Sequence, residues 1–133
     1  MEPRITRVNP EEMHSNPAFT QAVVVQGAAR TIYVGGQNAV DAAGQIVGAG
    51  DLGAQSEQVY RNLETVIAAS GGSLHDIIKL TILVVVGQDI RPGFEVWQRF
   101  WGTEAPPPAV SMAFVAGLAH PDFLVEIEAI AVA

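Results

Sequence analysis

The closing segment of the chain, from Phe123 to Val132, reads as a β-strand with apolar residues on both of its faces. Alternate residues of a strand point to opposite sides. One side would carry Val125, Ile127, Ala129 and Ala131, and the other side Leu124, Ile130 and Val132. A strand of this kind has to be covered from both sides, and this requirement limits the possible folds more than any other feature of the sequence.

Two segments have the periodicity of amphipathic helices. The first begins after Asp51, a good N-cap, and ends at the Ser70-Gly71-Gly72 turn. The second begins after Asp89, tolerates Pro92 in its first turn, and ends before three consecutive prolines. The predicted apolar stripes are Leu52, Val59, Leu63, Val66 and Ile67 in the first helix, and Ile90, Phe94, Trp97 and Trp101 in the second.

The remaining apolar segments have the composition of strands. Residues 22–25 and 31–34 flank a turn-like stretch, which predicts a hairpin. Residues 77–86 predict a central strand and residues 109–115 another strand, while residues 1–18 predict an extended N-terminal arm. The whole chain, residues 1–133, is expected to form a single domain.

The predicted order of elements is β-β-α-β-α-β-β, which places the chain in the α+β class. Two helices can cover one face of a five- or six-stranded sheet. Because the sequence offers no further helix, a second copy of the chain is the simplest cover for the other face. We therefore expect a homo-oligomer.

Composition and charge argue against several classes of function. The net charge of −7 opposes binding to nucleic acid, and the seven Lys and Arg residues are scattered. The absence of cysteine excludes disulfides, thiolate metal sites and thiol nucleophiles. No signal peptide is visible at the N-terminus, and Lys79 and Thr81 interrupt the longest apolar run. We therefore expect a cytoplasmic location and no membrane contact.

Two possible cofactor signals are weak. Residues 48–53 match the spacing of a dinucleotide-binding loop, but the expected acidic residue about twenty positions further on is missing. Asp51 would also place a carboxylate where the pyrophosphate should lie, so the motif is interpreted as a loop and a helix cap. His14, His75 and His120 lie far apart, without the spacing of a metal site. We expect neither a cofactor nor a metal ion.

Glu126 and Glu128 occupy alternate positions of the last strand, so both carboxylates point to one face, roughly 7 Å apart. A carboxylate among aliphatic residues either pairs with a cation or has a raised pKa, which suits acid/base chemistry on water. One alternative is a structural ion pair with Lys79 or Arg30. Lys79 and Glu128 are the leading candidates for a buried pair.

Five short motifs follow one another in the sequence: Tyr33 to Gln37, Asn62-Leu63, Ser73 to Thr81, Pro107 to Ala109, and Val125 to Ala131. Together they resemble the RidA (YjgF-like) family, from Phe19 to the C-terminus. The resemblance implies a chorismate-mutase-like (bacillus-type) fold, in which a sheet is backed by two helices. It also implies a homotrimer whose sheets form a barrel-like core.

The same resemblance implies a ligand pocket between subunits. In the family's deaminases an arginine after the Pro-Ala pair binds the carboxylate of an enamine or imine acid, and this position is Val110 here. Glu126 matches a glutamate that positions or activates water, which makes it the candidate catalytic residue. Other family positions that have changed are a serine, a cysteine, an aromatic hydroxyl and an asparagine, now Gly35, Met112, Phe19 and Phe94.

Valine cannot replace a charge-assisted bond to carboxylate, which is worth about 1.5–3 kcal/mol. We therefore predict an apolar pocket for a neutral or weakly polar small molecule. If the protein is an enzyme, we expect a hydrolase of C–N bonds of the imine/enamine deaminase type. Two alternatives stay open: a genuine 2-iminobutanoate/2-iminopropanoate-type deaminase that recruits Arg30 or Arg99, and a non-enzymatic, chaperone-like trimer. The net charge disfavours a ribonuclease or translation-inhibitor role.

Overall fold

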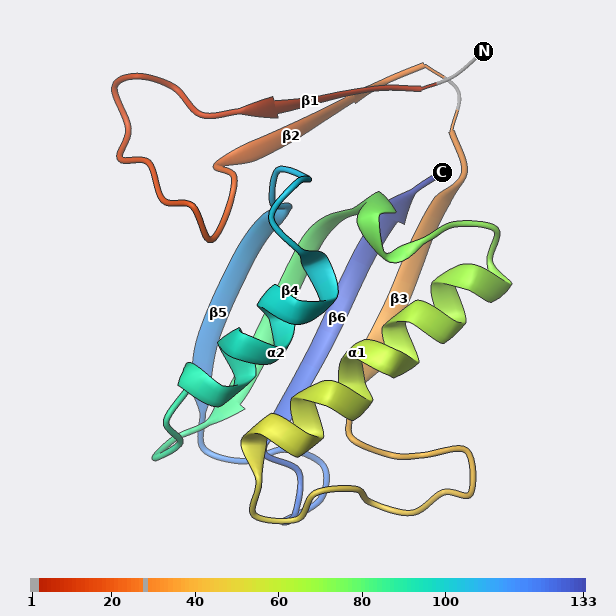
Figure 1. Cartoon of the computed structure of the whole chain (residues 1–133), viewed down its shortest axis with the longest axis vertical. Coiled ribbons are helices and arrows are strands. Elements are labelled where there is room, and N and C mark those ends of the chain that lie inside the picture. The colour runs from red at the N-terminus through yellow and green to blue at the C-terminus, as the bar shows by residue number, and fades with distance from the viewer. Residues whose placement is uncertain (1–2, 28) are drawn as a thin grey trace.

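The computed structural model describes residues 3–27 and 29–133. Within these residues, two helices lie on one face of a four-stranded sheet, and a separate two-stranded sheet lies beyond one end of it (Figure 1). The elements are β1 Arg4–Val8, β2 Ala22–Gln26, β3 Thr31–Gln37, α1 Leu52–Ala69, the 3-10 turn Leu74–Asp76, β4 Ile77–Val85, α2 Arg91–Trp101, β5 Ala109–Val115 and β6 Val125–Val132. The predicted α+β fold with a sheet backed by two helices is confirmed.

Helix α1 begins as the sequence predicts. The Asp51 side chain accepts a hydrogen bond from the Ala54 backbone N–H at 3.0 Å, so residues 48–53 form a loop and a cap. Helix α1 ends where Gly71 adopts a φ of +91°, a conformation that glycine takes without strain. Val66 is 37 % exposed, so its predicted place in the buried stripe is wrong. It lies in the last turns of the helix, at the edge of the buried stripe.

Helix α2 begins at Arg91, and Pro92 lies in its first turn. Asp89 does not cap the helix in the predicted way, because Ile90 is the capping residue. The Asp89 carboxylate instead accepts a bond from the Arg91 backbone N–H at 3.1 Å and also pairs with the Arg91 side chain. Helix α2 connects the parallel strands β4 and β5 and packs against α1 through Trp97 and Tyr60, whose ring centroids are 5.3 Å apart.

The four-stranded sheet has the order β3-β6-β4-β5, with β4 and β6 in the centre. Its register decides which residues share a face. Ile82 of β4 lies opposite both Ile127 of β6 and Met112 of β5, on the side that α1 and α2 cover. Leu83 lies opposite Glu126 on the other side, which we call the open face. The open face also carries Lys79, Thr81, Glu128, Ile130 and Tyr33.

The predicted hairpin of residues 22–25 and 31–34 is wrong. Strand β2 pairs with β1, and β3 pairs with β6. Paired backbone hydrogen bonds between Arg30 and Ala133 extend the β3–β6 ladder, and Ala28 of the predicted turn lies outside the described residues. As a result three strands precede α1, the N-terminal arm includes a paired strand, and the main sheet has four strands instead of five or six.

Candidate functional site

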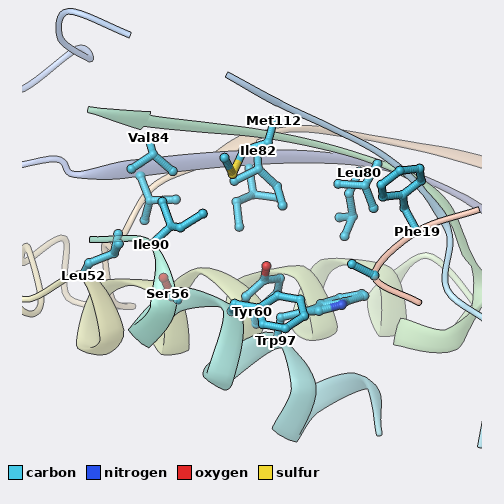
Figure 2. Close-up of a pocket in the computed structure, with 16 residues that line it drawn as sticks. Phe19, Leu52, Ser56, Tyr60, Leu80, Ile82, Val84, Ile90, Trp97 and Met112 are labelled. Carbon is cyan, nitrogen blue, oxygen red and sulfur yellow. The ribbon is translucent and has the colours of Figure 1, made fainter. Parts of the chain in front are cut away.

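A cavity of about 260 Å³ lies between the helices and the sheet, close to β5 (Figure 2). We call it the apolar pocket. Leu80, Ile82 and Val84 of β4 form its wall on the sheet side, and α1 and α2 form the opposite wall. Its deep part is closed, since Leu80 and Ile127 are fully buried. Its mouth lies where Phe94 of α2 and Met112 of β5 are both 43 % exposed.

Phe19 forms one side of the mouth, although it belongs to the N-terminal segment. The neighbouring Thr20 holds it there. The Thr20 backbone N–H donates to the Pro108 carbonyl at 3.0 Å, and the Thr20 hydroxyl donates to the Pro107 carbonyl at 2.8 Å. Thr20 also forms a parallel β-bridge with Ala109, the first residue of β5, so the N-terminal segment is attached at the beginning of that strand.

Every residue of 3–27 and 29–133 that lines the apolar pocket is uncharged. The two arginines proposed as substitute cations lie elsewhere. The Arg99 guanidinium is 3.9 Å from the Glu57 carboxylate, on the exposed side of the helix layer. The Arg30 guanidinium donates to the Ser70 carbonyl at 3.4 Å, beyond the end of α1. Neither of them supplies a positive charge to this cavity.

Two hydroxyl groups from α1, together with the indole N–H of Trp97, are polar side-chain groups of the lining. Ser56 and Tyr60 are each 2 % exposed, and Figure 2 shows both oxygens pointing from the helix toward the sheet. Burial raises the pKa of Tyr60 well above its usual range, so the phenol is neutral. Neither residue is among the site residues predicted from the sequence. Their spacing from Leu52, Val59 and Leu63 was the available signal, because it places them on the buried face of the helix.

The predicted site residues do not all share one cavity of the single chain. Four of them line the apolar pocket, namely Phe19, Phe94, Val110 and Met112. Gly35 and Glu126 lie on the open face. A Cβ atom built on the adjacent Gly36 would be 2.7 Å from the Glu126 carboxylate oxygen, so this carboxylate rests against the backbone of β3.

The second glutamate also differs from its prediction. Glu128 is exposed, and the Lys79 ammonium donates to the Ser111 hydroxyl at 2.6 Å. No ion pair joins Lys79 to Glu128 among the described residues. The predicted buried pair is therefore wrong for the single chain. Both residues line a shallow hollow of the open face together with Tyr33 and Gly35.

Buried amide side chains fix the loops at one end of the pocket. Gln55 is fully buried, donates to the Gly48 and Asp122 carbonyls at 3.2 and 2.7 Å, and accepts from the Leu124 N–H at 2.9 Å. Asn62 donates to two carbonyls of the loop after β3. The Gln55 bonds attach the beginning of β6, which carries Glu126 and Ile127, to α1, and the Asn62 bonds attach the loop after β3 to the same helix.

The histidines lie in separate environments. The His75 ring is bonded to the Trp101 carbonyl at 2.6 Å, and the His120 ring accepts from the Asp122 N–H at 3.0 Å. In residues 3–27 and 29–133, no three His, Asp or Glu side chains form a group that could hold a metal ion. No helix in these residues has the length and apolar character needed to cross a membrane.

Comparison with known proteins gives consistent matches over most of the chain. The family model described as Endoribonuclease L-PSP matches residues 10–133. A rat protein named 2-iminobutanoate/2-iminopropanoate deaminase is 32% identical over 116 residues, which are 86% of this chain and 80% of the relative. A RutC family protein of Pyrococcus horikoshii is 33% identical over 85% of each chain. The crystal structure of YyfB, a Rid family protein from Yersinia pestis, has a TM-score of 0.83 and 35% identity, covering 96% of this chain and 97% of that one.

Proposed function

This chain belongs to the RidA (YjgF-like) family, and we propose that it binds a small, neutral or weakly polar molecule instead of the imino acids named for its deaminase relatives. The observation that carries the proposal is the lining of the apolar pocket. It contains Val110 where the resemblance places the carboxylate-binding arginine, and none of the described residues in it is charged. An anionic ligand would lose its hydration there without gaining an ionic partner.

We further propose that the pocket is completed in a homotrimer. The mouth around Phe94 and Met112 is an exposed apolar surface, and the open face is a second uncovered surface that combines aliphatic residues with glutamates. Because these two surfaces differ, their contact is heterologous, and heterologous contacts close into rings when the rotation permits. In such a ring Gly35 and Glu126 of one chain face the mouth of the neighbour's pocket. This arrangement would unite the six predicted site residues, which the single chain separates.

Glu126 then has a chemical role at the mouth. Its carboxylate would accept a proton from a water molecule as the water oxygen adds to the carbon of a C=N bond. That proton would pass to the nitrogen to give a carbinolamine. The hydroxyl proton of the carbinolamine would then reach the nitrogen by way of the same carboxylate, and cleavage of the C–N bond would release ammonia or an amine and leave a carbonyl product. Catalysis by Glu126 is one part of the proposal. The other part, binding of a small molecule in the pocket, does not require turnover.

The test compares a neutral ester with the anion of the parent acid. Methyl 2-oxobutanoate is neutral, whereas 2-oxobutanoate is an anion. We expect the ester to bind more tightly to the native protein, as measured by calorimetry, and Val110→Arg to reverse the order. Tighter binding of the anion by the native protein would overturn the proposal.

A second candidate is a genuine 2-iminobutanoate/2-iminopropanoate deaminase, which the name of the rat relative favours. A coupled assay that generates 2-iminopropanoate in situ separates the two candidates. We expect turnover far below that of the rat protein, and comparable turnover would establish the deaminase. Sedimentation at micromolar concentration tests the trimer separately, and a monodisperse monomer would contradict the inter-subunit site. RNA cleavage is disfavoured by the net charge of −7.

A further inference from the structure

The inner wall of the apolar pocket carries two hydroxyl groups that face the cavity. Ser56 and Tyr60 are each 2 % exposed, lie one helical turn apart on α1, and point into the cavity (Figure 2). Within residues 3–27 and 29–133, neither hydroxyl has a protein hydrogen-bond partner, although Thr65 and Ser70 of the same helix region each donate to a helix carbonyl. Other short polar side chains of this helix region therefore do find partners.

Both hydroxyl oxygens are accessible from the cavity. Among the residues that the structure describes, Arg7 Nε is the one side-chain polar atom that is both fully enclosed and without a hydrogen-bond partner, so neither hydroxyl oxygen is sealed in by protein atoms. Phenylalanine at position 60 would keep the ring contact with Trp97, and alanine at position 56 would fit beside Gly93, on which a Cβ would lie 3.1 Å from the Ser56 hydroxyl oxygen. Packing therefore does not require the two hydroxyls, and they give the wall of the cavity its capacity to bond to a ligand.

The chemistry of the cavity restricts that partner. Burial keeps the Tyr60 phenol protonated, so this residue is a hydrogen-bond donor at any physiological pH. None of the described lining residues is charged, which disfavours carboxylates, phosphates and ammonium groups. A carbonyl oxygen, in contrast, is neutral and has two lone pairs that accept from hydroxyls. It is the polar group that this lining satisfies best.

The rest of the cavity restricts the body of the ligand. Its volume of about 260 Å³ lies below the range of about 300–1,000 Å³ that is usual for drug-sized ligands. Trp97 and Tyr60 present aromatic surfaces on the helix side, and Leu80 and Ile82 present aliphatic surfaces on the sheet side. A short hydrocarbon body or a single ring fits between these layers.

We infer that the apolar pocket recognises a small neutral carbonyl compound, whose oxygen accepts a hydrogen bond from Tyr60 while its hydrocarbon body lies between the two layers. Ser56 offers a second hydroxyl from the same wall. This inference rests on the proposed function, since it requires that the pocket bind a small molecule, and it adds the group that the pocket selects.

The experiment compares acetophenone with ethylbenzene, which has a similar shape and no carbonyl oxygen. Isothermal titration calorimetry reports the binding of both compounds on the same scale. We expect native protein to prefer acetophenone, and Tyr60→Phe to weaken acetophenone binding by about two- to twelvefold, the range of one neutral hydrogen bond. Ethylbenzene should bind Tyr60→Phe as well as it binds native protein. Ser56→Ala should also weaken acetophenone binding and leave ethylbenzene binding unchanged.

Two further measurements distinguish recognition from a structural role. Without ligand, Tyr60→Phe should melt at nearly the same temperature as native protein, because the ring contacts with Trp97 and Phe100 are kept. Thr65→Val, which removes an exposed hydroxyl from the same helix, should change neither affinity. Equal affinity of native protein for both compounds, or an unchanged acetophenone affinity in Tyr60→Phe, would overturn the carbonyl inference alone. Failure of both compounds to bind would count against the pocket itself and hence against the proposed function.

Discussion

On the helix-facing side of the four-stranded sheet, Val125, Ile127 and Ala129 are buried by α1 and α2, whereas on the open face Ile130 is half-buried and Tyr33 is 78 % exposed. The first side forms a closed core and a cavity within one chain. The second side combines aliphatic residues with glutamates and has no cover of its own. One strand, β6, contributes alternate residues to both sides.

The difference shows how one strand can serve two purposes. The helix-facing residues of β6 contribute to the stability of the chain and to the shape of the pocket. The open-face residues contribute little to the fold of a single chain, so they are available for contact with a neighbouring copy. Substitutions on the two sides should therefore change different measurable properties.

The largest expected effect comes from truncating each side of β6 in turn. Ile127→Ala removes a side chain that is 1 % exposed, and should lower the free energy of unfolding by about 2–5 kcal/mol. Ile130→Ala should lower it much less and should instead weaken association of the chains. Urea denaturation at fixed protein concentration measures the first effect, and sedimentation over a dilution series measures the second. Equal losses of stability in both variants, with association unchanged, would contradict the distinction between the two sides.

A smaller effect is expected where β6 is attached to α1. Gln55→Leu keeps the bulk of the side chain and removes its three hydrogen bonds, which leaves the Asp122 carbonyl and the Leu124 N–H without this partner. The free energy of unfolding should fall by about 1–3 kcal/mol. Gln98→Leu, at an exposed position of α2, is the matched control and should have little effect. If both glutamine variants behave alike, the bonds of Gln55 do not anchor β6.

A still smaller effect is expected for the glutamates of the open face. Because Glu128 is exposed and unpaired in the described chain, Glu128→Ala should change the free energy of unfolding by no more than about 0.5 kcal/mol. A buried ion pair would have lost about 3–5 kcal/mol. Glu126→Gln should leave the melting temperature nearly unchanged and alter ligand binding or hydrolysis. A large loss of stability in Glu128→Ala would mean that a neighbouring chain buries this carboxylate.

The smallest effect concerns the beginning of α2, away from both sides of the sheet. Hydrogen bonds from Arg91 lower the pKa of Asp89 to about 2. Because the pKa is lowered in the folded protein, ionised Asp89 stabilises the fold. This stabilisation is present above the ordinary carboxyl pKa, near 4, and is lost as the pH falls toward 2. Since the pair is exposed, the contribution is small. The difference in melting temperature between native protein and Asp89→Asn should shrink between pH 6 and pH 2.5, and a difference that grows would contradict this assignment.

Local patterns predicted the elements of the fold well. The Asp51 cap, the Gly71 stop and the aliphatic run of β4 depend on interactions within a few residues, so they can be read from the sequence. The pairing of β2 could not be read in this way. Strands β2 and β3 are neighbours in the sequence, but the partner of β3 is β6, about a hundred residues away. Only the packing of the whole sheet decides between such partners.

The candidate site could likewise be predicted only where it depends on local patterns. Alternation along β6 correctly placed Glu126 and Glu128 on one face. The relation of that face to Val110 and Met112 depends on the register of three strands, which alternation within one strand does not contain. The hydroxyls of Ser56 and Tyr60 gain significance only from a cavity that residues of five separate elements and the N-terminal segment enclose.

The attachment of Phe19 by Thr20 has a consequence for the timing of ligand exchange. This side of the mouth is held by hydrogen bonds from Thr20 to the carbonyls of Pro107 and Pro108, outside both helices and the four-stranded sheet. Local openings that break few contacts need much less free energy than global unfolding. The Thr20 amide should therefore exchange its hydrogen for deuterium faster than the amides of β4. A bound ligand in contact with Phe19 would slow hydrogen exchange at the Thr20 amide, so the exchange rate of this amide would report how often the pocket opens.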